Sequence, residues 1–157
     1  MNQQLIDGYS LLIRSVSEIS EVLSIGKSGG NELPVHGESD IDIYVFCSVI
    51  PAIKARQSAV QKVGGAVSYA NYSENGGRFW GTVDFITLEE TEICLMYFTA
   101  SFMDDDIESV LNGTRLDKEA GMFYPAGRCA TMLTMHVLYD KTGYIAHMKA
   151  RLSAGTV

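Results

Sequence analysis

Apolar residues near the N-terminus recur at alternating steps of four and three, which is the spacing of one face of an α-helix. They are Leu5, Tyr9, Leu12, Val16 and Ile19. The spacing predicts a helix over 3–20 with one buried face. A second helix is predicted over 51–63, because Pro51 fits a first helical turn and Gly64-Gly65 follow as a stop.

Short apolar runs bounded by glycine or polar residues predict strands in the rest of the chain. The first run covers 21–25, and the glycines that follow it are expected to break the strand at Gly26, Gly29 and Gly30. A second strand is predicted over 66–70. Strands over 80–87 and 92–99 flank the turn at 88–91, so they are predicted to pair as an antiparallel hairpin.

The C-terminal third predicts further helices and one more strand. A helix over 104–111 would hold the acidic run DDD in its favourable first turn, and Asn112-Gly113 would end it. A short helix follows Pro125, a strand covers 136–139, and the last helix runs through Ile145, Met148 and Leu152. These elements predict the α/β (α+β) class, with a mixed, mainly antiparallel sheet flanked by helices in one domain over 1–157.

Length and charge narrow the class of partner. The chain has 157 residues, enough for one domain with its own core. Its 12 Lys and Arg against 19 Asp and Glu give a net charge of −7, and no basic cluster offers phosphate contacts, which argues against a long nucleic acid as partner.

Widely spaced cysteines in apolar surroundings indicate buried reduced thiols. No apolar run approaches the roughly 20 residues that span a bilayer, and the N-terminus does not resemble a signal peptide, so we expect a cytoplasmic protein with no membrane partner.

The segment 40–47, DIDIYVFC, predicts a buried strand with an acidic entrance. Ile41 and Ile43 share one face, whereas Asp40 and Asp42 share the other at a separation of roughly 6–7 Å. Carboxylates this close repel each other, and a hard divalent cation relieves the repulsion while binding triphosphate oxygens. The alternative is a solvated strand entrance, although an unpaired charge at the edge of a core is costly.

The GKS sequence at 26–28 raises the question of a phosphate loop. It does not form a Walker motif, because position 21, where that motif needs glycine, is Glu21. The turn could still present backbone N–H groups and the Ser28 hydroxyl to a phosphate, or it could be only a tight turn.

Taken together, SIGKSGG at 24–30 and GESDIDIYVF at 37–46 resemble the signature of the polymerase-beta-like nucleotidyltransferase superfamily. In that signature, a Gly-Ser turn precedes an Asp-apolar-Asp strand. The rest of the chain is similar to bacterial nucleotidyltransferase-domain proteins related to the antibiotic nucleotidyltransferases. The resemblance therefore implies a nucleotidyltransferase-type fold for this chain.

The resemblance also implies an activity and a set of site residues. The activity is transfer of a nucleoside monophosphate from a nucleoside triphosphate, expected to be ATP, to a hydroxyl of a small molecule or a protein. Asp40 and Asp42 would hold Mg²⁺, and Gly26, Ser28 and Gly29 would cradle the phosphates.

Two features depart from the pattern of that superfamily. Lys27 stands where relatives usually have a small residue. Relatives commonly carry a third carboxylate on a neighbouring strand, and the candidates are Asp84 and Glu92. We favour Asp84, as a metal ligand or as the base for the acceptor, because it lies between apolar residues in mid-strand. One alignment places Cys94 where relatives often have aspartate.

These departures leave a second function class open, a nucleotide-binding or regulatory module of the same fold with little or no turnover. The helical C-terminal domain usual in relatives is expected to be absent. Such a domain would cover apolar surface beside the cleft, and pairing of two copies in a homodimer is another way to cover it.

Overall fold

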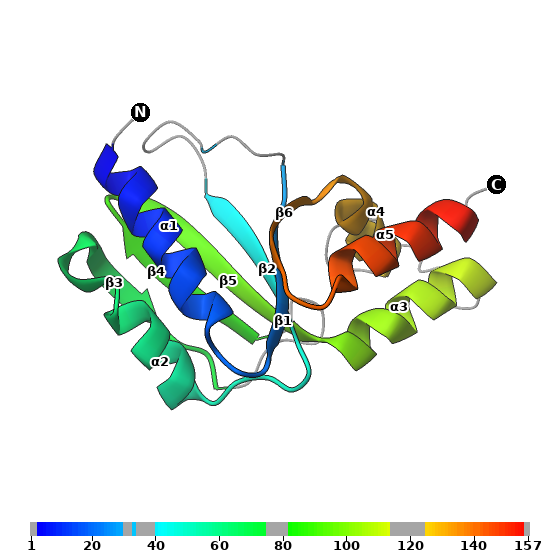
Figure 1. Cartoon of the computed structure of the whole chain (residues 1–157), viewed down its shortest axis with the longest axis horizontal. Coiled ribbons are helices and arrows are strands. Elements are labelled where there is room, and N and C mark those ends of the chain that lie inside the picture. The colour runs from blue at the N-terminus through cyan, green and yellow to red at the C-terminus, as the bar shows by residue number, and fades with distance from the viewer. Residues whose placement is uncertain (1–2, 30–32, 34–39, 75–81, 114–124, 156–157) are drawn as a thin grey trace.

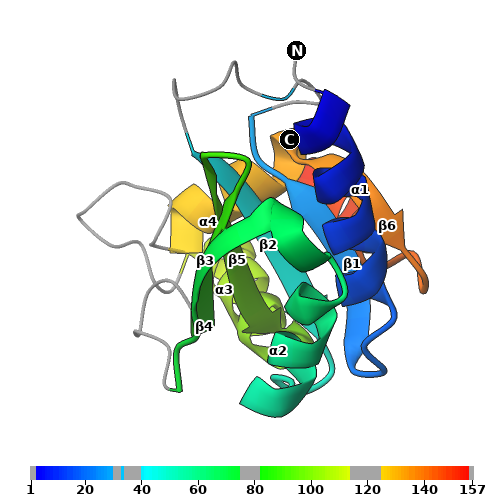
Figure 2. The ribbon, with the colours of Figure 1, turned by 90° about the vertical axis from the view of Figure 1, so that its left-hand side faces the viewer.

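The structure is a computed structural model that describes residues 3–29, 33, 40–74, 82–113 and 125–155. One six-stranded sheet crosses the molecule, and helices pack on both of its faces (Figures 1 and 2). The helices are α1 (Gln3–Ser17), α2 (Ile53–Gln61), the short 3₁₀ helix η1 (Gly64–Ala66), α3 (Ala100–Asn112), α4 (Pro125–Thr134) and α5 (Tyr144–Gly155). The strands are β1 (Val22–Lys27), β2 (Ile41–Cys47), β3 (Val67–Asn71), β4 (Thr82–Leu88), β5 (Thr91–Thr99) and β6 (His136–Asp140).

The strands lie in the order β3-β4-β5-β2-β1-β6. Strands β2 and β5 are parallel, and the other neighbouring pairs are antiparallel. The predicted fold class, a mixed and mainly antiparallel sheet flanked by helices, is therefore confirmed. None of the helices in the described part of the chain is long and apolar enough to cross a bilayer.

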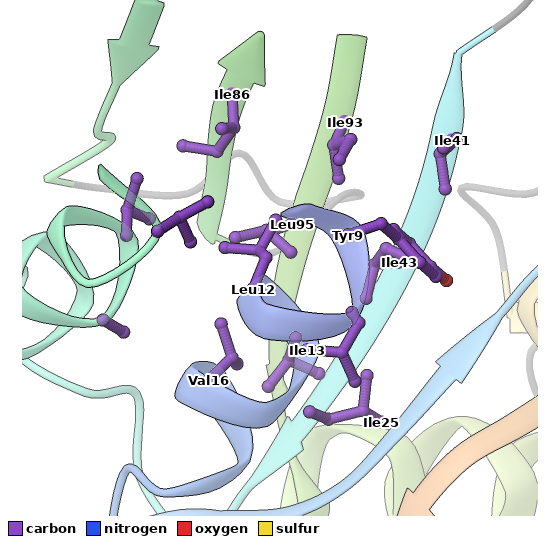
Figure 3. Close-up of a cluster of buried hydrophobic side chains, with 14 of the residues drawn as sticks. Tyr9, Leu12, Ile13, Val16, Ile25, Ile41, Ile43, Ile86, Ile93 and Leu95 are labelled. Atoms are coloured by element: carbon purple, nitrogen blue, oxygen red, sulfur yellow. The ribbon is translucent and has the colours of Figure 1, made fainter. Parts of the chain in front are cut away.

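Each face of the sheet has its own hydrophobic core. On one face, α1 lays the predicted stripe of Leu12 and Val16 over Ile43 of β2 and Leu95 of β5 (Figure 3). On the other face, α3, α4 and α5 cover an aromatic and methionine-rich cluster. Its buried members are Tyr44, Phe46, Met96, Phe98, Met103, Ile107, Cys129, Met132, Met135, Ile145, Met148 and Leu152. Because β2 and β5 are covered on both sides, their inner residues are apolar in both alternating positions.

The predicted hairpin is confirmed, with a tighter turn than expected. Strands β4 and β5 pair from Thr82–Tyr97 to Leu88–Thr91, leaving only Glu89 and Glu90 in the turn. Both turn residues have positive φ angles, 47° and 65°, as a two-residue turn that follows the twist of the strands requires. The predicted start of this hairpin at Trp80 lies outside the described residues.

The predicted start of α3 at Asp104 is wrong. The helix begins at Ala100, because the Thr99 hydroxyl accepts a hydrogen bond from the Phe102 N–H and caps the first turn. The DDD run therefore lies in the middle of the helix, where the macrodipole does not explain it. Its third member, Asp106, is buried in an ion pair with Arg128 of α4. The predicted end of the helix at Gly113, which has a φ of 66°, is confirmed.

The predicted break of the first strand at Gly26 is also wrong. Strand β1 continues through Gly26, which pairs with Tyr44 of β2 and Val137 of β6. The chain turns afterwards, at Ser28 and Gly29, and Gly29 has a φ of 78°. Glycine is needed at position 26 for space, because a Cβ there would lie 2.1 Å from the Met135 sulfur. The break predicted at Gly30 lies outside the described residues.

We expect Gly26→Ala to lower the free energy of unfolding by about 1–3 kcal/mol, because the added methyl must displace Met135 from a packed core. Urea denaturation would measure this change. Gly65→Ala is the matched control, since no atom of the described residues lies within 4 Å of a Cβ at Gly65. Equal stability of the two variants would show that Met135 moves aside at no cost.

Candidate metal centre

The parallel pairing of β2 with β5 brings acidic residues from two distant segments to one end of the sheet. Asp42 lies opposite Cys94, and the register continues one pair earlier with Ile41 opposite Ile93. The two isoleucines point into the α1 core, so Asp42 and Cys94 face the other side. Both strands run parallel, so Glu92 on β5 and Asp40 just before β2 lie at this same end.

The ligand atoms of Asp40, Glu92 and Cys94 lie within 4.8 Å of one another. Asp42 lies beside this group, opposite Cys94 in the register. Asp40 and Glu92 are exposed, whereas Asp42 and Cys94 are half-buried. We call these four residues the acidic cluster.

Burial and electrostatic repulsion within the acidic cluster raise the pKa of two of its members, Asp42 and Cys94. Burial raises the pKa of Asp42, and the charges of Asp40 and Glu92 raise it further, while the Cys94 hydrogen bond and the Lys27 charge oppose the shift. Burial and the three neighbouring carboxylates raise the pKa of the Cys94 thiol to about 12. Cys94 is therefore a protonated thiol at neutral pH, and it points its S–H at Glu92 Oε1, 3.9 Å away.

The turn after β1 lies beside the same end of β2. The Ser28 N–H donates to the Asp42 carbonyl oxygen at 3.1 Å, which ties the turn to the acidic strand. Lys27 is only 6% exposed, and its ammonium group donates to the Ser28 carbonyl oxygen at 3.1 Å. Burial lowers the pKa of Lys27, and the Asp42 carboxylate opposes this shift. The structure thus brings together Ser28, Gly29, Asp42 and a buried cation.

The donor set of the acidic cluster fits a hard divalent cation. Asp40, Asp42 and Glu92 offer carboxylate oxygens, the ligands that Mg²⁺ and Ca²⁺ prefer. Their mutual repulsion is what a bound cation would relieve. The thiol of Cys94 suits a soft metal only after it loses its proton, which its raised pKa opposes. The residues present therefore fit Mg²⁺ through oxygen ligands.

The structure does not bring Asp84 to this centre, which corrects our preference for Asp84 as the third carboxylate. Asp84 alternates with Val83 and Phe85 and shares the face of Ile86, on the α1 side of the sheet. Its side chain is fully buried there and forms an ion pair with Arg56 of α2. The carboxylate near Asp40 is the other candidate, Glu92.

Arg56 explains why a carboxylate is tolerated in that core. Its guanidinium bonds Asp84, donates through Nε to the Pro51 carbonyl at 3.0 Å and through Nη2 to the Ser73 carbonyl at 2.8 Å. It also lies over the Tyr97 ring, 5.5 Å from its centroid. Burial raises the pKa of Asp84, and the Arg56 charge opposes this shift. Asp84 holds α2 and the segment after β3 against the sheet.

Sequence reasoning missed Arg56 and the buried Asp106–Arg128 pair, and it ranked Glu92 below Asp84. Strand period alone could have reversed that ranking. Ile93 and Leu95 alternate with Glu92 and Cys94, so Glu92 lies on the face of β5 opposite to Ile93, whereas Asp84 shares the parity of the apolar Ile86. Nothing in the local pattern around Arg56 indicates that it is buried.

Comparison with models of known protein families and with curated proteins finds no match for this chain. The case for a function therefore rests on the geometry of the acidic cluster and the turn beside it.

We expect Asp84→Asn to lower the free energy of unfolding by about 3 kcal/mol, because it leaves the buried Arg56 charge without a counter-charge. Urea denaturation would measure the loss, and a Mn²⁺ titration of the folded variant would show unchanged metal affinity. Asp105→Asn, at an exposed position of α3, is the control. A stable Asp84→Asn protein that no longer binds Mn²⁺ would show that Asp84 is a metal ligand after all.

Proposed function

We propose that this chain is a divalent-metal-dependent nucleotidyltransferase, which moves a nucleoside monophosphate from a nucleoside triphosphate to a hydroxyl of a small molecule or protein. The observation that carries the proposal is the cluster of Asp40, Glu92 and Cys94, with Asp42 opposite Cys94 in the register and tied to the Ser28–Gly29 turn. The resemblance of the glycine turn and the Asp-x-Asp strand to the nucleotidyltransferase superfamily supports the same reading.

Asp40, Asp42 and Glu92 would hold Mg²⁺, which when bound neutralises triphosphate charge and polarises a phosphoryl oxygen. The acceptor oxygen forms a bond to the α-phosphorus, and the bond from that phosphorus to the bridging oxygen breaks. Pyrophosphate leaves with the electron pair, and the hydroxyl proton passes to water. Catalysis of this kind depends on positioning and charge rather than on a covalent intermediate with the protein.

The turn after β1 is the candidate phosphate-binding segment. Gly29 has a positive φ, and within the described part of the chain no atom lies within 4 Å of where its Cβ would be, so its backbone is open to a ligand. The Ser28 hydroxyl adds a hydrogen-bond donor, and the Lys27 ammonium group adds a positive charge that interacts with the Asp42 carboxylate. Gly26 contributes indirectly. Because it has no side chain, β1 can pack against Met135 and remain paired with β2, which positions the following turn beside Asp42.

Cys94 supports a second candidate, a nucleotide-binding module with weak or no turnover. It faces Asp42 at the position where one alignment places the aspartate of relatives, and its thiol is protonated at neutral pH. The centre would then bind a metal–nucleotide complex through Asp40, Asp42 and Glu92 with a poorer match to the transition state. Mg²⁺-dependent release of pyrophosphate from labelled triphosphates, across a panel of hydroxyl acceptors, separates the two candidates.

We expect Asp42→Asn to weaken binding of Mg²⁺ with a non-hydrolysable ATP analogue by about tenfold or more, because it removes one charged oxygen ligand. Its stability should stay equal or rise slightly without metal, because one member of a repelling set loses its charge. Titration calorimetry and urea denaturation would measure both effects. Asp105→Asn serves again as the exposed control, and equal affinity of wild type and Asp42→Asn would remove Asp42 from the metal site.

We expect Cys94→Asp to tighten Mg²⁺ binding and to raise pyrophosphate release, because it replaces a protonated thiol with an ionised oxygen ligand opposite Asp42. Cys94→Ser is the control, because serine is a small polar residue like aspartate but carries no charge. If the aspartate variant folds and binds Mg²⁺ no better than the serine variant, position 94 does not face the ion.

A further inference from the structure

The face of the sheet that carries the acidic cluster continues as an open surface over β4 and β3. Phe85 of β4 lies opposite Cys94, and Asn71 of β3 lies opposite Phe85. One row earlier along β5, Thr87 lies opposite Glu92, and Tyr69 of β3 lies opposite Thr87. Two rows of side chains therefore run from the acidic cluster to the β3 edge.

Two large aromatic side chains are exposed on these rows. Phe85 is 40% exposed and Tyr69 is 57% exposed. They are diagonal neighbours across β3 and β4, a spacing of roughly 7–8 Å that lets large side chains meet. Single exposed apolar residues are ordinary, but an aromatic pair beside a candidate metal centre forms a surface on which a ligand can rest.

The local backbone places Tyr69 on this face. The pairing of β3 with β4 shifts between Val67 and Tyr69, as a bulge does. Val67 and Ala70 consequently both pack on the α1 side of the sheet, and Tyr69 points away from it. Phe85 points the same way, since Ile86 next to it lies in the α1 core.

The order of the strands gives this surface a role, and the argument rests on the proposed function. The candidate phosphate turn at Ser28 follows β1, on one side of Asp42, and Phe85 lies on the other side, across Cys94. In phosphoryl transfer, the attacking and leaving oxygens lie roughly in line on opposite sides of the phosphorus. If pyrophosphate leaves over β1, the acceptor approaches over β5 and β4.

We propose that Tyr69 and Phe85 form the binding surface for the acceptor, a small hydroxyl compound that carries a planar or ring-shaped apolar face and is uncharged or cationic. The aromatic rings stack on the apolar face of the acceptor. Asn71 and Thr87 lie in the same two rows and bear polar groups that can bond its substituents. The carboxylates of Asp40, Asp42 and Glu92 disfavour an anion on this side of the centre.

Tyramine, ethanolamine and 4-hydroxyphenylacetate are matched probes for this proposal. Tyramine carries a ring, a hydroxyl and a positive charge; ethanolamine lacks the ring, and 4-hydroxyphenylacetate carries a negative charge instead. We expect ligand-observed NMR titrations, without nucleotide or metal, to detect binding of tyramine and much weaker binding of the other two. Phe85→Leu and Tyr69→Thr should each weaken tyramine binding by about fivefold. Val49→Thr, at another exposed apolar position, should not change it.

Equal tyramine affinity in wild type, Phe85→Leu and Tyr69→Thr would overturn the proposal. So would a change of sedimentation from dimer to monomer in these variants with tyramine binding intact, since the surface would then pair two copies of the chain. Because the titrations contain no nucleotide, they stand apart from the transferase assay. Ring-dependent binding without nucleotide transfer would support this binding surface and refute the proposed function. Nucleotide transfer with an unchanged KM for tyramine in both variants would support the proposed function and refute this binding surface.

Discussion

The parallel pairing of β2 with β5 determines where apolar and acidic side chains lie in this fold. These two strands are covered by helices on both faces, so the residues along their length are apolar in both alternating positions, as Ile43 and Tyr44 are on β2. Polar side chains are tolerated on β2 and β5 only where these strands begin, beyond the helices that cover them. Because the strands are parallel, both beginnings lie at the same end of the sheet, and Asp42 and Cys94 meet there. The acidic cluster is thus a consequence of the same register that builds the two cores.

Two buried ion pairs decide which carboxylates remain for chemistry. Asp84 bonds Arg56 in the α1 core, and Asp106 bonds Arg128 at 3.0 Å on the opposite face, where the guanidinium also lies 4.9 Å from the centroid of the Phe102 ring. Breaking either pair would leave a buried charge, which costs far more than the intact pair contributes. These acids hold helices against the sheet, and the exposed Asp40 and Glu92 are the ones that can exchange water for a metal.

Most of the fold could be predicted from the spacing of apolar residues, because each long helix and strand must present a continuous apolar face. The stripe through Leu12 predicts α1, and the alternation around Asp42 predicts the faces of β2. Sequence reasoning failed where contacts between distant residues decide the outcome. Gly26 continues a strand because Met135 fills the space above it, and α3 begins four residues early because Thr99 caps it. The sequence places Asp84 between apolar residues in mid-strand, and only the fold brings Arg56 beside it.

The thiol at position 94 limits what the acidic cluster can hold. Burial and the charges of Asp40 and Glu92 raise the pKa of Asp42, and a carboxylate at position 94 would add repulsion that a bound cation relieves. A protonated thiol fills the same place without charge, so the carboxylates of Asp40, Asp42 and Glu92 together with the Lys27 ammonium group leave a net charge that one divalent ion would balance. On this charge count, the proposed function needs one divalent ion rather than two.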